Sequence, residues 1–366
     1  MTSIPDNLLI KFSDIGLDPG IILVSIILAL GLAIFSIMAV NALVAVYFER
    51  KISAFMQDRL GPMEVGIFGF KGGKRFWGGI GQTVADGIKL LFKEDILPKD
   101  SDRFLMVLSP FIIFAGALLT FIAIPFSPSL VISDFNIGIF YIIAMSSVGV
   151  IGIILAGWSS NNKWSLYGAM RAAAQIISYE IPIGLSLLLV VLVTGSLNIG
   201  DVVLWQESNR WFIFHSPFIF VSFFIFFVSV VAETNRVPFD IPEAESELVA
   251  GWMTEYSGFR WAIFFLTEYG NVLIVSLVGS IIFLGGWLSP FHIFNIFPES
   301  WSFLDGPIVG VFWLIVKASL LIFVMIWFRW TFPRLRVDQL MYLCWKVFIP
   351  FSLINLFFVS LWELIF

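Results

Sequence analysis

Residues 21–47 read IILVSIILALGLAIFSIMAVNALVAVY and contain no charged side chain. A helix needs about 20 apolar residues to cross the hydrocarbon core of a bilayer, and this stretch exceeds that length. It is also too long for the apolar core of a signal peptide, and no small-residue cleavage site follows it. The stretch therefore predicts a transmembrane helix that stays in the mature protein.

The composition extends this prediction to the whole chain. Hydrophobic residues make up 59% of the 366 positions and charged residues 13%, whereas a soluble domain is about half apolar and a quarter charged. We expect an all-α integral membrane protein with about eight transmembrane helices in one membrane domain over residues 1–366. The predicted spans are 21–47, 104–126, 139–157, 176–197, 212–232, 261–287, 307–328 and 345–362.

The basic residues predict the orientation of these helices. Eighteen of the 21 Lys and Arg side chains lie in four segments, namely 48–103, 158–174, 233–260 and 329–346. The opposite side has only Lys11 and Arg210. Because cytoplasmic loops are enriched in Lys and Arg, the four rich segments are expected in the cytoplasm and both termini on the outer, periplasmic side.

Residues 82–94 have the periodicity of a short amphipathic helix. Asp86, Lys89 and Lys93 share one face. The opposite face carries Val84, Ile88, Leu91 and Phe92. The segment is too short and too charged to span a bilayer, so we expect a helix that lies in the cytoplasmic interface. A helix packed on a partner protein fits the same pattern.

Three charged residues lie inside predicted spans: Glu180, Glu268 and Lys317. A charge in mid-membrane costs at least ~2.5 kcal/mol on insertion scales, so such residues are typical of ion or proton pathways. Pro182 follows Glu180 and frees a backbone carbonyl near it. A structural ion pair between Lys317 and one glutamate is the alternative.

The segment 233–260 is acidic on an otherwise basic side. Its acids are Glu233, Asp240, Glu243, Glu245, Glu247 and Glu255. Crowded carboxylates can hold and exchange protons, although a plainly solvated loop fits the pattern equally well. Arg236 and Asp240, four residues apart, look like a salt-bridged loop clamp. Glu49-Arg50-Lys51 is expected to end the first helix at the interface.

The sequence offers few cofactor ligands. It has one cysteine, Cys344, and two histidines, His215 and His292. One thiolate cannot hold an Fe–S cluster, and no haem or metal site is indicated. We also find no nucleophile–base pair, no nucleotide-binding glycine loop and no long basic run for nucleic acid. Any electron transfer must use centres on partner chains.

Between residues of about 40 and 350, the chain closely resembles the H subunit of bacterial respiratory complex I, the NADH:quinone oxidoreductase, which is equivalent to subunit 1 of the mitochondrial enzyme. The motifs that carry the resemblance are ERK at 49–51, RLGP at 59–62, ADGIKL at 85–90, KE at 93–94, GWSSN at 157–161, RAAAQ at 171–175, SYE at 178–180, AETNR at 232–236, SEL at 246–248, EY at 268–269 with Asn271, RLR at 334–336 and QL at 339–340.

The resemblance implies a subunit that joins the membrane arm to the peripheral arm, forms much of the quinone chamber and starts an acidic path toward the pump subunits. The first span, the helix at 82–94 and the sixth span would frame the quinone entrance. The residues implied in the proton path and coupling are Glu180, Glu233, Glu243, Glu245, Glu247, Glu268 and Lys317. Those implied in the chamber are Arg50, Asp86, Glu94, Arg171, Arg236, Asp240 and Arg334.

The same resemblance implies a quinone (ubiquinone or menaquinone) as substrate and a bacterial plasma membrane as the site. The FMN, the Fe–S clusters and the quinone headgroup ligands would belong to peripheral-arm partners, and small membrane subunits would lie beside this chain. The chain has insertions at about 63–79, 205–215 and 290–305 relative to short family members, and the first of them leaves the shape of the entrance open.

Two other functions stay open at this point. One is the membrane anchor of a related membrane-bound hydrogenase or ferredoxin-driven oxidoreductase. The other is a stand-alone secondary transporter, whose mark would be broken helices at matching positions of two halves. The chain has Pro182 and Pro217 within helical segments but no convincing paired repeat.

Overall fold

The computed structural model describes residues 4–5, 19–66, 78–242, 248–290 and 306–365, and most of these residues are helical. No β-strand occurs within the described ranges, where the only bridge joins Ser127 and Leu130. The predicted all-α membrane fold is therefore confirmed.

The helices follow one another along the chain. They are α2 (Pro19–Met56), α3 (Gly81–Phe92), α4 (Arg103–Ile122), α5 (Gly138–Ser159), α6 (Lys163–Thr194), α7 (Ile199–Ser208), α8 (Phe212–His215), α9 (Pro217–Glu233), η2 (Gly251–Met253), α11 (Gly258–Phe283), α12 (Pro307–Thr331), α13 (Val337–Tyr342), η5 (Leu343–Phe348) and α14 (Ile349–Ile365).

Among the described residues, seven helical stretches are long and apolar enough to span a membrane. They are α2, α4, α5, α6, α11, α12 and the continuous stretch from α13 to α14. The one remaining predicted span, 212–232, corresponds to α9, which has 17 residues. That length is at the lower limit for a transmembrane helix. The total of eight spans and the single membrane domain stay predictions.

Several helices differ in length from the predicted spans. The first runs to Met56 rather than ending near 47, so the ERK motif lies inside it. Helix α6 begins at Lys163, well before 176, because Asn162 caps its first turn and the following alanine-rich stretch favours helix. Thus Arg171, expected in a loop, lies within α6. Segment 212–232 is divided at Ser216, which caps α9, with Pro217 in its first turn.

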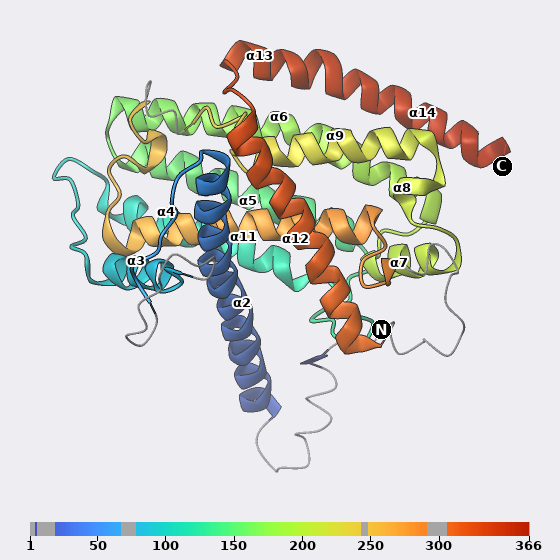
Figure 1. The fold of residues 1–366 in the computed structure, drawn as a ribbon, viewed down its shortest axis with the longest axis horizontal. Coiled ribbons are helices and arrows are strands. Elements are labelled where there is room, and N and C mark those ends of the chain that lie inside the picture. Colours follow the sequence, from blue (N-terminus) through green and yellow to red (C-terminus); the bar gives the residue numbers. More distant parts are fainter. Residues whose placement is uncertain (1–3, 6–18, 67–77, 243–247, 291–305, 366) are drawn as a thin grey trace.

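Helix α11 is the centre of the bundle. It packs against α2, α3, α4, α7, α9 and α12, while α6 joins α5, α9 and α14. Figure 1 shows α6, α9 and α11 running in nearly the same direction, with α2 and α12 crossing them steeply. The lower part of α2 projects beyond the other helices in this view. Side chains there are exposed and apolar, as in Leu28 and Leu32, which suits a lipid-facing or partner-facing surface.

The short amphipathic helix appears as α3, at residues 81–92 instead of 82–94. It packs against α2 and α11. The apolar side chains of Ile88 and Phe92 are exposed, at 50% and 87% of their maximal area. This exposure leaves both predicted settings open, because either lipid or a partner protein would cover such a face.

A proline in α6 determines a contact with the C-terminal helices. Pro182 has no N–H, so the carbonyl of Ser178 one turn earlier lacks its helical donor. The Cys344 thiol lies 3.0 Å from this carbonyl and donates to it. Cys344 belongs to η5, a π-helical turn between α13 and α14. The carbonyl expected to be free near Glu180 is therefore satisfied by a side chain from another helix.

Candidate functional site

A large cavity lies between α2, α3, α4 and α11. Its volume is about 400 Å³. Its lining is apolar except for Arg50, Thr83 and Asp86. The apolar lining residues are Phe35, Ala39, Ala42, Leu43 and Val46 of α2, Gly87, Leu90 and Leu91 of α3, Phe111 and Phe114 of α4, and Phe259, Ala262, Ile263, Phe265 and Leu266 of α11. An apolar cavity of this size with a few polar groups is typical of a small-molecule site.

An ion pair stands at the polar end of this cavity. Nη1 of Arg50 lies 2.6 Å from Oδ2 of Asp86, so the pair joins α2 to α3. Gln82 donates to the other carboxylate oxygen of Asp86 at 3.0 Å. Both charged side chains are roughly two-fifths exposed, so solvent screens their attraction. The pair therefore does more to shape the rim of the cavity than to stabilise the fold.

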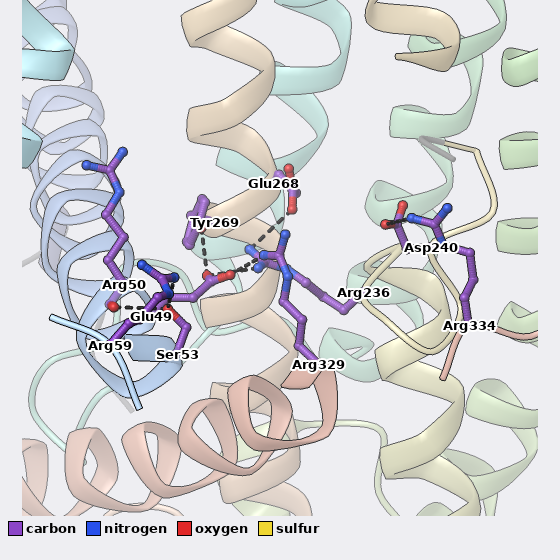
Figure 2. Close-up of polar contacts among 10 residues, drawn as sticks. All are labelled: Glu49, Arg50, Ser53, Arg59, Arg236, Asp240, Glu268, Tyr269, Arg329 and Arg334. Atoms are coloured by element: carbon purple, nitrogen blue, oxygen red, sulfur yellow. Dashed lines mark hydrogen bonds and ion pairs between the residues drawn. The ribbon is translucent and has the colours of Figure 1, made fainter. Parts of the chain in front are cut away.

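A second charged cluster lies between α2, α11, α12 and the segment after α9 (Figure 2). Its members are Glu49, Arg236, Glu268, Tyr269 and Arg329, and we call it the Glu49 cluster. Oε2 of Glu49 accepts hydrogen bonds from Arg236 at 3.0 Å and from the Tyr269 hydroxyl at 2.7 Å. Oε1 of Glu49 pairs with Arg329. Nη2 of Arg236 also lies 3.2 Å from Oε1 of Glu268.

The charges of the Glu49 cluster balance, since two carboxylates face two guanidinium groups. Glu49 and Arg236 are only 7% and 6% exposed. Burial acts to lower the pKa of Arg236, but the carboxylates of Glu268 and Glu49 together outweigh it and hold that pKa above its ordinary value. The guanidinium also stacks on the Tyr269 ring, 4.5 Å from its centroid. Arg236 thus stays charged and binds both acids.

Asp240 and Arg334 form a separate pair at 2.8 Å, as Figure 2 shows. The predicted clamp between Arg236 and Asp240 is wrong, because Arg236 extends toward Glu49 and Glu268 while Asp240 reaches the segment after α12. The pKa of Asp240 is raised by burial, although the neighbouring Arg334 opposes this. Its Oδ1 atom is buried without a hydrogen-bond partner among the described residues.

Glu180 and Glu233 line one small cavity between α4, α5, α6, α9 and α11. Its volume is about 40 Å³. A water molecule needs about 10–15 Å³ of such space, so a few waters fit in this cavity. Two serines of α5, Ser146 and Ser147, donate to Oε1 of Glu180. The structure therefore brings together two of the predicted path acids.

Lys317 lies apart from these acids. It is buried in α12, and its Nζ atom donates to the carbonyls of Gly286 and Leu288 at 2.9 and 2.6 Å. These carbonyls follow the end of α11, where a cation also offsets the helix dipole. Nζ lies 4.1 Å from the centroid of a Trp211 ring. These contacts favour a structural task for Lys317 at the end of α11.

The remaining predicted residues are scattered. Arg171 stacks on Tyr167 within α6, at 4.5 Å from the ring centroid. Glu94 is exposed just after α3, and its backbone carbonyl accepts from Ser257. Neither is among the residues that line the cavity of about 400 Å³. Glu243, Glu245 and Glu247 lie outside the described residues.

The sequence interpretation missed Glu49, Arg329 and Tyr269. Glu49 was expected to end its helix at the membrane surface, but α2 continues for seven residues and carries Glu49 into the interior. Arg329 was counted only as a loop cation, yet it lies in the last turn of α12. A charged residue placed before the end of a long helix is the signal that could have found both.

Similarity to known proteins covers all of these sites. Residues 28–360 match the family model described as NADH dehydrogenase. The chain belongs to the NADH dehydrogenase family. The matched range includes the cavity, the Glu49 cluster and both acids beside the small cavity, so the predicted family is confirmed.

Three relatives within the NADH dehydrogenase family illustrate the similarity, and each is named as the H subunit of NADH-quinone oxidoreductase. The protein of Chlorobaculum tepidum is 52% identical over 322 residues, which cover 87% of this chain and 86% of the relative. That of Chlorobium luteolum is 48% identical, covering 96% and 91%. That of Bacteroides thetaiotaomicron is 45% identical, covering 91% and 89%. The helices and these relatives together identify a multi-pass membrane protein.

Proposed function

We propose that this chain is the membrane subunit of a proton-translocating NADH:quinone oxidoreductase and that it forms the quinone chamber with peripheral-arm partners. The observation that carries the proposal is the apolar cavity between α2, α3, α4 and α11, with Arg50 and Asp86 at its polar end. A quinone has a long apolar tail and a polar headgroup, and this lining suits both. The names of the relatives support the same activity.

The coupling part of the proposal is electrostatic. Quinone reduction takes up electrons and protons, so it changes the charge inside the chamber. Glu49 and Arg236, the buried pair of the charge-balanced Glu49 cluster, respond to such a change more strongly than exposed charges do. We place the response of Arg236 and Glu268 first, followed by proton movement through Glu233 and Glu180, which share the small cavity.

The chain needs partners for the redox steps. One buried cysteine, Cys344, cannot hold a cluster by itself, so FMN and Fe–S centres are assigned to the peripheral subunits. The quinone, ubiquinone or menaquinone, is the substrate. In this proposal the basic segments face those subunits in the cytoplasm, both termini lie on the periplasmic side, and the host is a bacterial plasma membrane.

The test starts from the assembly purified in mild detergent through a tag on this chain, in which NADH-driven quinone reduction and proton pumping are measured after reconstitution. The proposal expects both activities, and it expects Glu180→Gln to lower both while the assembly stays intact. Arg50→Gln should raise the KM for quinone. An intact assembly that ignores NADH but turns over with hydrogen or ferredoxin would overturn the assignment.

A further inference from the structure

Two neighbouring serines of α5 contact the carboxyl group of Glu180. Oγ of Ser147 donates to Oε1 of Glu180, and Oγ of Ser146 lies 3.5 Å from the same oxygen. Each hydroxyl has a second acceptor, the backbone carbonyl of Ile143, at 2.9 Å from Ser146 and 3.0 Å from Ser147. The carboxyl oxygen and the carbonyl therefore compete for the same two hydroxyl protons.

A serine hydroxyl has one proton to donate and two lone pairs that accept. When Glu180 is ionised, the hydroxyls can donate to its carboxylate. When Glu180 is protonated, a serine hydroxyl can turn its own proton toward the Ile143 carbonyl. Its oxygen can then accept a hydrogen bond from the O–H group of the Glu180 carboxylic acid. Both protonation states are thus satisfied by a rotation about one side-chain bond, without a shift of either helix.

The position of the serines beside the small cavity gives this rotation a function in proton exchange. Ser146 and Glu180 line the small cavity of about 40 Å³, and Glu233 lines it as well. Because both serines contact Oε1 of Glu180, its other carboxyl oxygen stays available for waters in the cavity. The serines would therefore fix the direction in which Glu180 exchanges its proton.

Serines that bond only to a carbonyl of their own helix are ordinary in membrane helices. Ser276 in α11 is an example, because its hydroxyl donates to the carbonyl of Val272 at 2.7 Å. Ser146 and Ser147 differ from it in having an ionisable side chain of another helix as a second acceptor. This difference distinguishes serines that can position a carboxyl group from serines that bond only to their own helix.

We propose that Ser146 and Ser147 are positioning residues of the proton path, which hold the Glu180 carboxyl in both of its protonation states. The inference rests on the proposed function and adds α5 to the elements that carry proton transfer. It predicts that the hydroxyl groups matter, while the side-chain size at these positions does not.

The experiment uses the reconstituted assembly and compares Ser146→Ala/Ser147→Ala with Ser276→Ala as the matched control. The infrared band of the Glu180 carboxyl or carboxylate group is assigned by its loss in Glu180→Gln. In the double variant we expect this band to shift and coupled quinone reduction to fall about tenfold, the effect of losing a hydrogen bond to a charged group. Ser147→Thr, which keeps a hydroxyl, should retain both properties, as should Ser276→Ala.

The outcomes separate this inference from the proposed function. An unshifted band and full coupled activity in the double alanine variant, with activity lost in Glu180→Gln, would overturn the positioning task alone. Full activity in Glu180→Gln would overturn the proton path of the proposed function itself. If the double variant does not assemble, Ser146→Ala and Ser147→Ala are measured singly, and an unshifted band in both contradicts the inference.

Discussion

Nη1 of Arg236 lies 3.0 Å from Oε2 of Glu49, although 187 residues separate them in the chain. The contact joins α2, at the start of the described chain, to the segment that follows α9. Both side chains are almost fully buried. An ion pair in such a place is costly to break, because the remaining partner is left as an uncompensated buried charge.

Glu49→Gln should therefore destabilise the protein strongly. The change leaves the guanidinium groups of Arg236 and Arg329 facing each other with one carboxylate, that of Glu268, instead of two. We expect a loss of about 3 kcal/mol in stability, measured by thermal unfolding of the purified assembly.

The double variant Glu49→Gln/Arg329→Gln removes one charge of each sign, so it should recover part of this loss. Lys99→Gln, at an exposed position, serves as the control and should change little. Equal stability of Glu49→Gln and the control would contradict the importance of the cluster.

Gln175 should hold the segment between Ala232 and Phe239 in place. Its Nε2 atom lies 2.7 Å from the carbonyl of Ala232 and 2.8 Å from that of Phe239. In Gln175→Leu both buried carbonyls lose this donor, at a cost of about 1–3 kcal/mol. Hydrogen exchange should show faster exchange of this segment in the variant, while unchanged protection would contradict the anchoring contact.

Asp240 should make stability depend on pH. Burial raises its pKa in the folded state above the ordinary value of about 4. The folded state then binds this proton more tightly than the unfolded state does. The contribution of Asp240 to the free energy of unfolding is therefore present at low pH, and it is lost as pH rises from the unfolded-state pKa through the folded-state pKa. Above its ordinary pKa, the wild type should lose thermal stability relative to Asp240→Asn, and parallel curves for the two proteins would contradict the assignment.

Lys317→Met should affect stability more than coupling. The ammonium group donates to the carbonyls of Gly286 and Leu288 beyond the end of α11. Its removal leaves these buried acceptors without their donor, which costs about 2 kcal/mol. The number of protons pumped per electron, measured after reconstitution, should stay the same. A fall in that ratio at normal stability would return Lys317 to the proton path.

Much of the membrane fold could be predicted from the sequence, because apolar length alone identifies a span such as 21–47. The ends of the helices could not, since helices extend beyond the apolar run wherever caps and local propensity allow, as the Asn162 cap does for α6. Hydropathy indicates which residues lie in lipid, but it does not show whether a helix continues into water.

The candidate site was predicted as a set of residue types rather than as pairs. Glu180 and Glu268 were identified because a charge inside a membrane span needs a reason, and the structure places Glu180 beside a small cavity and Glu268 beside Arg236. Which charge meets which depends on helix crossings between distant parts of the chain. For this reason Arg236 was assigned to its neighbour Asp240 and not to Glu49.

The most direct test concerns the apolar cavity as the passage of the quinone. Ala39→Phe on α2 would fill the cavity, whereas Ala33→Phe adds the same group at an exposed position of the same helix. The KM for a long-chain quinone should rise about tenfold in Ala39→Phe alone, and reduction of a water-soluble acceptor by the peripheral partners should not change. Equal KM values for the two variants and the wild type would contradict the cavity's role as that passage.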